Sequence, residues 1–221
     1  MISDCTDPYQ PLEKDYQITR KCIEVLAKHG FPLLLVTKSD MVVRDVDVFK
    51  KTPTVVAVTV TTPREEIAHL TEPDAPPPEK RLSTLQKIVE NDVPAVARID
   101  PILPGLNDDL KDFENLISSL ASVGVRQVTV STMKLVRGVF NEMKQTNPQV
   151  WRRLVDEYAD GVWLVGYKYL HIEKRRKILE ELRPIVLKHG LDFASCREGF
   201  PELNTVLCDG SEHCRRSLSL Y

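Results

Sequence analysis

The sequence alternates short apolar segments with segments of helical periodicity, and this alternation constrains the fold most strongly. Four apolar segments rich in β-branched residues predict strands at 32–37, 54–61, 94–99 and 125–130. Helical spacing separates them at 15–29, 41–50, 82–89 and 110–120. Strands that alternate with helices are typical of parallel sheets with helical crossovers. We therefore expect an α/β fold with the four strands adjacent in chain order, and a full or partial β/α barrel fits better than a doubly wound sheet.

The last third of the chain has a different pattern. Residues 148–159 and 169–188 predict helices, and the sequence after Gly190 is typical of a loop. We expect a partial β/α barrel over residues 1–145 and a helical C-terminal extension with a cysteine-containing tail over residues 146–221. The basic run at 174–177 is interpreted as a solvated helix face, with nucleic-acid contact as the alternative.

Composition excludes several classes of protein. The chain has 30 Lys and Arg against 32 Asp and Glu, a net charge of −2, which gives no global field that attracts nucleic acid or an anionic membrane. It has no apolar run long enough for a membrane span and no signal-peptide pattern at its start. Five cysteines, an odd number, argue against a disulfide scaffold and for a reducing compartment. We therefore expect a soluble cytoplasmic protein.

Polar side chains follow the predicted strands where each strand ends. In a β/α barrel the functional groups lie at the C-terminal ends of the strands. These ends carry hydroxyl groups and charges: Thr37, Lys38, Ser39, Thr59, Thr61, Arg98, Asp100, Ser131 and Lys134. Helix capping is the alternative role for Ser39 and Ser131. Lys38 and Arg98 are stronger candidates, because a charge at the end of a buried strand needs a partner.

A polar segment with two prolines precedes the first predicted helix. Pro8 and Pro11 restrict the backbone of residues 3–13, so this segment is expected to be a rigid loop. It presents the side chains of Cys5, Asp7, Tyr9 and Gln10. The alternative is a capped turn that starts a helix.

Five stretches, taken in chain order, carry a resemblance to a known family. They are TDPYQP at 6–11 with Glu13, VTKS at 36–39, Arg44-Asp45, Glu72-Pro73 with Arg81, and PILPGLND at 101–108. The set resembles the radical S-adenosylmethionine (SAM) superfamily, in the DNA repair photolyase-like branch related to spore photoproduct lyase. The resemblance covers roughly residues 1–135.

The resemblance implies a partial β/α barrel that binds a 4Fe-4S cluster and SAM. In the family the reduced cluster cleaves SAM to a 5′-deoxyadenosyl radical, which takes a hydrogen atom from the substrate. The substrate is unidentified, with nucleic acid as one candidate. By position, Lys38 and Ser39 are expected near the methionine carboxylate, and Cys5 matches the hydrogen-atom donor. The implied cofactor-binding residues are Asp7, Tyr9, Gln10, Glu13, Lys38, Ser39, Thr59, Thr61, Arg98, Asp100, Pro104 and Asn107.

The family's cluster-binding CxxxCxxC motif does not occur in the 221 residues. We expect the first βα unit of the barrel to be supplied from elsewhere, either by a longer parent protein or by a partner. An exposed strand edge and self-association are then expected on that side. Two alternatives are a non-catalytic barrel fragment or binding module, and a metal-independent enzyme that uses Lys38 and Asp100.

Three of the five cysteines lie in the tail. Cys196, Cys208 and Cys214, with His213 next to the last, are candidate ligands for zinc or for an auxiliary iron-sulfur cluster. Free or buried thiols and a redox pair are the alternatives.

Overall fold

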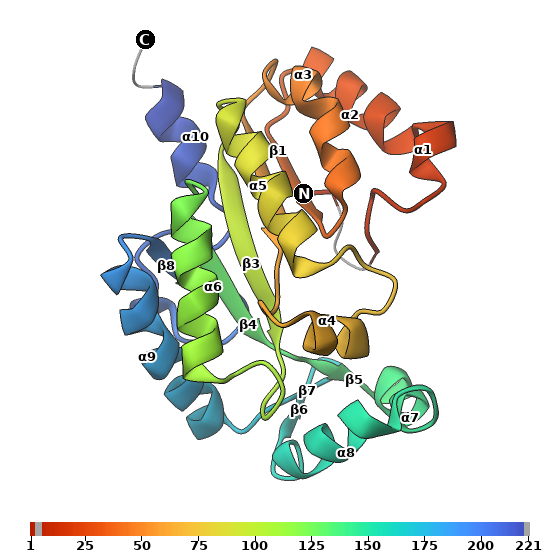
Figure 1. Ribbon diagram of the computed structural model, residues 1–221, viewed down its shortest axis with the longest axis vertical. Helices are drawn as coiled ribbons and strands as arrows, with labels where there is room; N and C mark the ends of the chain where they lie inside the picture. Colours follow the sequence, from red (N-terminus) through yellow and green to blue (C-terminus); the bar gives the residue numbers. More distant parts are fainter. Residues whose placement is uncertain (3–5, 219–221) are drawn as a thin grey trace.

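Five parallel strands form the main sheet, in the order β1-β2-β3-β4-β8 (Figure 1). In the computed structural model, which describes residues 1–2 and 6–218, each neighbouring pair of these strands is parallel. The prediction of four parallel strands adjacent in chain order is therefore confirmed. The strands are β1 (Leu33–Thr37), β2 (Thr54–Thr59), β3 (Ala95–Ile102), β4 (Gln127–Thr132) and β8 (Asp192–Ser195).

Helices cover one face of this sheet. Alternate strand residues such as Val58, Ala97 and Val128 point to that face and are fully buried, as the side-chain alternation of strands requires. Figure 1 shows α5, α6 and α9 along this side. The helices of this part are α1 (Glu13–Tyr16), α2 (Ile18–Lys28), the 3₁₀ helix η1 (Asp40–Asp45), α3 (Val46–Phe49), α4 (Glu65–Thr71), α5 (Pro78–Glu90), α6 (Leu110–Ser122) and α9 (Ile172–Lys188).

The C-terminal segment covers part of the opposite face of the sheet, which we call the inner face. The Gln127 amide donates to the Leu207 carbonyl at 3.0 Å, and the Cys214 thiol donates to the Thr54 carbonyl at 3.3 Å. Cys214 also packs against the apolar group of Val55, Ala57 and Val96. This segment contains η2 (Pro201–Leu203) and α10 (Ser211–Leu218).

The chain makes a long excursion between β4 and β8. It forms a small antiparallel sheet of β5 (Leu135–Val136), β7 (Tyr167–Tyr169) and β6 (Val162–Leu164), with α7 (Arg137–Thr146) and α8 (Pro148–Glu157) beside it. Leu135, Leu154 and Tyr158 form its separate apolar core with Leu103 and Leu106.

The expected helical extension over residues 146–221 needs one correction. β8 lies within that range and hydrogen-bonds to β4 as the fifth strand of the main sheet. Its four residues, DFAS, were expected to be part of a loop after Gly190, because so short a strand has almost no periodic signal. The last third of the chain therefore contributes one strand, β8, to the main sheet, while β6 and β7 belong to the separate small sheet.

The free side of β1 is the edge where an unpaired strand was expected. The Ile2 backbone forms a parallel bridge there, donating to the Leu34 carbonyl at 2.8 Å and accepting from the Val36 N–H at 3.3 Å. Ile2 thus pairs with part of this edge. Self-association through the edge stays a prediction.

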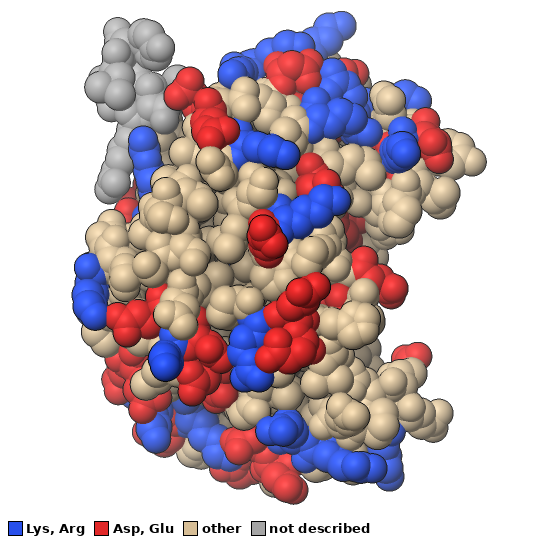
Figure 2. Space-filling model, viewed as in Figure 1, with Lys and Arg blue, Asp and Glu red and all other residues tan. Residues whose placement is uncertain are grey.

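The molecular surface carries both signs of charge. Figure 2 shows Lys and Arg interspersed with Asp and Glu on the visible face, and a hollow on the right-hand side between the region of α1 and α2 and that of α7 and α8. Among the described helices, none combines the length and apolar character needed to cross a bilayer.

Candidate functional site

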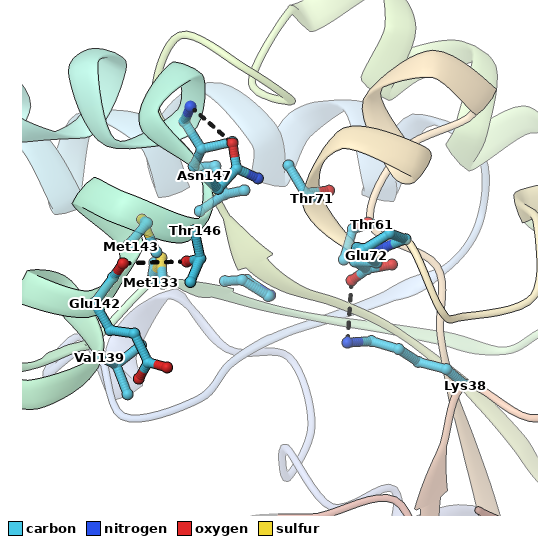
Figure 3. A pocket seen from close by; sticks show the side chains of 14 residues that line it. Lys38, Thr61, Thr71, Glu72, Met133, Val139, Glu142, Met143, Thr146 and Asn147 are labelled. Carbon is cyan, nitrogen blue, oxygen red and sulfur yellow. Dashed lines mark hydrogen bonds and ion pairs between the residues drawn. The ribbon is translucent and has the colours of Figure 1, made fainter. Parts of the chain in front are cut away.

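A cavity of about 430 Å³ lies at the C-terminal ends of the first four strands. Lys38 follows β1, Thr61 follows β2, Pro101 belongs to β3 and Met133 follows β4. Helices α4, α7 and α8 supply the remaining walls (Figure 3). The other lining residues are Thr71, Glu72, Pro73, Leu103, Val139, Glu142, Met143, Thr146, Asn147 and Val150.

Among the described residues, three charged ones line this cavity, namely Lys38, Glu72 and Glu142. The Lys38 ammonium pairs with the Glu72 carboxylate at 3.1 Å, as Figure 3 shows, and the Arg81 guanidinium pairs with the same carboxylate at 2.5 Å. Arg81 is 1% exposed and also donates to the Thr59 carbonyl at 3.2 Å. Because the Glu72 carboxylate is shared between Lys38 and Arg81, it does not fully neutralise the Lys38 ammonium, which can attract an anionic ligand group.

The Thr61 hydroxyl is a buried polar group in this cavity that makes no hydrogen bond within the described structure. Its side chain is buried, and its Oγ1 has no hydrogen-bond partner among the described residues. Buried hydroxyls are nearly always hydrogen-bonded, so an unpaired one that lines a cavity indicates a ligand or water contact.

The loop after β3 is fixed by Asn107. Its side-chain oxygen accepts from the Leu103 N–H at 2.6 Å, and its Nδ2 donates to the carbonyls of Thr61 at 3.0 Å and Pro101 at 3.1 Å. Asn107 therefore positions the loop, while Pro101 and Leu103 contact the cavity. Pro104 is buried in the same loop. Lys38 and this loop therefore face the same cavity.

The N-terminal loop is fastened to the end of β1 by Asp7. This carboxylate accepts hydrogen bonds from the Thr37 hydroxyl and the Lys38 N–H, both at 2.7 Å, and from the Tyr9 N–H at 2.9 Å. The Tyr9 hydroxyl donates to buried Asp45 at 3.1 Å. Burial, with the nearby Asp45 charge, raises the pKa of Tyr9, so its hydroxyl stays protonated.

Glu13 completes this hydrogen-bonded group. Its carboxylate accepts from the Thr19 N–H at 2.9 Å and from the Arg44 guanidinium at 2.9 Å. Arg44 and Arg20 both pair with Asp45. Asp7, Tyr9 and Glu13 thus hold the loop, and within the described chain they lie outside the lining of the cavity, as does exposed Gln10.

The remaining predicted residues take separate positions. Ser39 accepts from the Met41 N–H at 3.3 Å and caps η1, which is the alternative role expected for it. Cys5 lies outside the described residues. Thr59 is buried opposite Arg98 in the β2–β3 ladder, and Arg98 pairs with Asp100 at 2.6 Å. In the described structure these three residues are not part of the cavity lining.

The tail cysteines do not converge on one point, which corrects the predicted three-cysteine metal site. Cys196 and Cys208 are hydrogen-bonded through their side chains, whereas the Cys214 thiol donates to the Thr54 carbonyl at the start of β2. Among the described residues, no group of three His, Cys, Asp or Glu side chains has an arrangement that could hold a metal ion.

Sequence reasoning predicted a helix at 148–159, which is α8, but it missed α7 and the cavity wall that the two helices form. Asn147 caps α8, accepting from the Val150 N–H at 3.3 Å, and its Nδ2 donates to the Leu70 carbonyl of α4 at 2.7 Å. This contact joins the two walls of the cavity. Pro148 is the first residue of α8, which is where the sequence predicts this helix to begin.

Solved structures share this arrangement of sheet and helices. Spore photoproduct lyase complexed with dinucleoside spore photoproduct superposes with a TM-score of 0.68 and 16% identity, over 87% of this chain and 59% of that one. SuiB of Streptococcus suis bound to SAM gives a TM-score of 0.55 and 9% identity, over 86% of this chain and 40% of the other.

The chain has the radical SAM fold. A domain of the pyruvate-formate lyase-activating enzyme of Bacteroides vulgatus shares the radical SAM fold with a TM-score of 0.54 and 13% identity, over 81% of this chain and 90% of that domain. No protein-family model matches the sequence.

Three relatives by sequence are uncharacterised proteins. One from Acidianus two-tailed virus is 35% identical over 166 residues, which is 72% of this chain and 54% of the relative. One from Methanocaldococcus jannaschii is 37% identical over 108 residues, 48% of this chain and 41% of the relative. One from Mycobacterium tuberculosis is 28% identical over 194 residues, which is 84% of this chain and 55% of the relative. The chain with the radical SAM fold thus spans about half the length of these relatives.

Proposed function

We propose that the chain forms the core of a radical SAM enzyme and that the cavity beside Lys38 binds SAM. The observation that carries this proposal is that the cavity combines the Lys38 ammonium with a buried Thr61 hydroxyl that has no hydrogen-bond partner among the described residues, both at the C-terminal strand ends. Two structural neighbours support it, since one is described as bound to SAM and the other as a lyase complexed with a dinucleoside.

The residues that line the cavity match the chemical groups of SAM. Lys38 supplies a positive charge for the carboxylate, and Thr61 supplies a hydroxyl for the ribose. Leu103, Met133 and Val150 offer apolar surface for the adenine. When SAM is bound with a reduced cluster, it supplies an organic radical that removes a hydrogen atom from a substrate.

The described residues do not fit the cluster itself. Their thiols form no group of three, and the sequence has no CxxxCxxC motif. We therefore propose that the cluster ligands come from outside these 221 residues, in a longer parent protein or a partner. Nucleic acid is the substrate class we favour, because the lyase neighbour is described with a dinucleoside. The odd number of cysteines supports a reducing, cytoplasmic location.

The test is SAM binding to the purified chain by isothermal titration calorimetry. We expect Lys38→Met to weaken SAM binding by about 10-fold or more, because a hydrogen bond from a charged group is lost. We expect Thr61→Val to weaken it by roughly 5- to 10-fold, because a neutral hydrogen bond is lost. Lys80→Met is the matched control, because Lys80 pairs with Asp40 on the surface and is not among the residues that line the cavity in the described structure. Equal affinities in all three variants, or no binding by the wild type, would contradict the proposal.

A second measurement separates an enzyme from a binding module. After anaerobic reconstitution with iron, sulfide and the missing unit from a relative, a radical SAM enzyme releases 5′-deoxyadenosine in the presence of dithionite. SAM binding with no release of 5′-deoxyadenosine would favour the non-catalytic module.

A further inference from the structure

We propose that Cys196 and Cys208 form a reversible thiol–disulfide pair on the inner face of the sheet, which reacts with low-molecular-weight disulfides. This site is separate from the cavity of the proposed SAM enzyme, and it does not depend on that proposal.

Strand β4 fixes the backbone of both cysteines. The Thr129 hydroxyl donates to the Cys208 carbonyl at 3.1 Å, and the Ser131 hydroxyl donates to the Cys196 carbonyl at 3.1 Å. Thr129 and Ser131 are two residues apart on β4, so their side chains point to the same face. The Cys196 N–H also donates to the Val130 carbonyl at 3.0 Å. Two cysteines distant in the sequence are thereby held against adjacent positions of one strand.

The two side chains contact each other. The Cys208 thiol is hydrogen-bonded to the Cys196 sulfur, and both residues are half-buried, so a small reagent can reach them. The other described cysteines have different surroundings, since Cys22 is exposed and Cys214 donates to the Thr54 carbonyl. The contact therefore distinguishes this pair from the remaining thiols of the described chain.

A guanidinium group stands beside the pair. Arg98 is paired with Thr129 in the β3–β4 ladder and contacts the Cys196 sulfur. The Cys208 hydrogen bond and then the Arg98 charge lower the pKa of Cys196, against the opposing effects of burial and of the Asp100 charge. The Cys196 contact, with burial and the Asp209 charge, raises the pKa of Cys208. Cys196 is thus the attacking thiolate and Cys208 the resolving thiol.

The reaction balances with a disulfide as oxidant. The Cys196 thiolate attacks one sulfur of the reagent, so its S–S bond breaks, a mixed disulfide forms and one thiolate leaves. Once the Cys196 sulfur is bonded, it no longer raises the pKa of Cys208. Cys208 then loses its proton and attacks the Cys196 sulfur, which releases the second reagent thiol. Two protein thiols are oxidised and one reagent disulfide is reduced to two thiols.

The bond would join the end of β8 to the segment that covers the inner face of the sheet. Such a cross-link restricts the unfolded chain, so we expect the oxidised protein to melt on the order of 5–10 °C above the reduced one.

The experiment treats the reduced chain with oxidised glutathione and maps the products by mass spectrometry. Trypsin cleaves after Arg197 but leaves Cys208 and Cys214 in one peptide, so cleavage after Glu212 by Glu-C protease is also required. We expect a Cys196–Cys208 disulfide that dithiothreitol reverses. In Cys208→Ala we expect glutathione to remain on Cys196, and in Cys196→Ala we expect Cys208 to stay unmodified. Cys22→Ser is the control, which should form the same disulfide as the wild type.

Three results would overturn the proposal. The first is a wild-type map in which Cys22 or Cys214 carries glutathione while Cys196 and Cys208 remain reduced. The second is glutathione on Cys208 in the Cys196→Ala protein. The third is one equivalent of zinc in the wild type that the Cys208→Ala protein lacks. The wild-type map needs no variant, so a substitution that prevents folding would not remove the test.

Discussion

Asn107 donates an amide hydrogen to the main-chain carbonyl of Thr61 at 3.0 Å, which joins two loops 46 residues apart in the chain. The contact places the loop after β3 against the end of β2, where both border the cavity.

Replacing Asn107 with Ala should therefore destabilise the fold. The change leaves the Leu103 N–H and the carbonyls of Thr61 and Pro101 without this buried partner. We expect the free energy of unfolding to fall by about 2–4 kcal/mol, measured by urea denaturation. Exposed Asn115 is the control, and Asn115→Ala should stay within about 0.5 kcal/mol of the wild type. Equal stabilities of the two variants would contradict the role of Asn107.

Gly210 offers a matched test of how closely the C-terminal segment packs. A Cβ at Gly210 would lie 2.6 Å from Val96 Cγ2 and 3.1 Å from Val55 Cγ1, whereas Gly30, which has the same φ of +73°, has nothing within 4 Å in the described structure. Both Ala variants carry the strain of a left-handed backbone, about 1–2 kcal/mol. In Gly210→Ala, overpacking should lower the free energy of unfolding by a further amount of about 1–3 kcal/mol, measured by urea denaturation. Similar losses in both variants would show that this segment can move away from the sheet.

The Glu13 group should make stability depend on pH in the acid range. Burial by itself raises the pKa of Glu13, but the hydrogen bonds from Thr19, Arg44 and Arg20 outweigh it and hold the pKa below its ordinary value of 4.5. A carboxyl with a depressed folded-state pKa stabilises the fold above its unfolded pKa, and this contribution is lost as pH falls through the folded value. Denaturation of the wild type should therefore become easier below about pH 4.5.

Glu13→Gln should remove that part of the acid dependence. At pH 7 we expect the variant to be about 1–3 kcal/mol less stable than the wild type, and the difference should narrow at pH 3. Exposed Glu79 provides the control, since Glu79→Gln should leave the pH profile unchanged. A constant difference between wild type and Glu13→Gln from pH 3 to pH 7 would refute this assignment.

The pH dependence of Cys196 alkylation by iodoacetamide should show the effect of Cys208 and Arg98 on this thiol. Its hydrogen bond with Cys208 and the Arg98 charge lower its pKa to about 6, so alkylation should be slow below that pH and fast above it. Cys208→Ala removes the largest of these effects, so the midpoint should move toward the ordinary thiol pKa of about 8.5. Exposed Cys22 in the same sample serves as the internal reference. Coincident pH profiles for Cys22 and Cys196 would rule out the activated thiolate.

The sheet could be predicted because its first four strands carry a strong local signal. Thr54–Thr59 is buried throughout and mostly β-branched, which identifies a central strand from composition alone. The missed elements lack such a signal. Helix α7 has no buried residue among those described, because Val139 and Met143 face the cavity and not the core, and β8 gains its place only from pairing with β4. Tertiary contacts, and not local preference, define both elements.

The candidate site was predictable only where strand ends determine it. Lys38 and Thr61 follow β1 and β2, so the topology alone brings them to one cavity. Asp7 and Glu13 were predicted to bind the cofactor as well, yet their carboxylates accept from backbone, threonine and arginine donors that no sequence pattern specifies. The cysteine prediction failed for a similar reason, because the turn into α10 carries Cys214 away from Cys196 toward the start of β2.

The excursion between β4 and β8 has a consequence for how such proteins diverge. It contributes one wall of the cavity through Met143, Asn147 and Val150, and it packs in a small apolar core that it shares with Leu103 and Leu106. The main sheet is completed by the pairing of β8 with β4, and this pairing does not depend on the sequence of the segment that connects the two strands. The connecting segment can therefore vary among related proteins, which would change the molecules that fit the cavity. The hydrogen-bonded ladder of the sheet need not change with it.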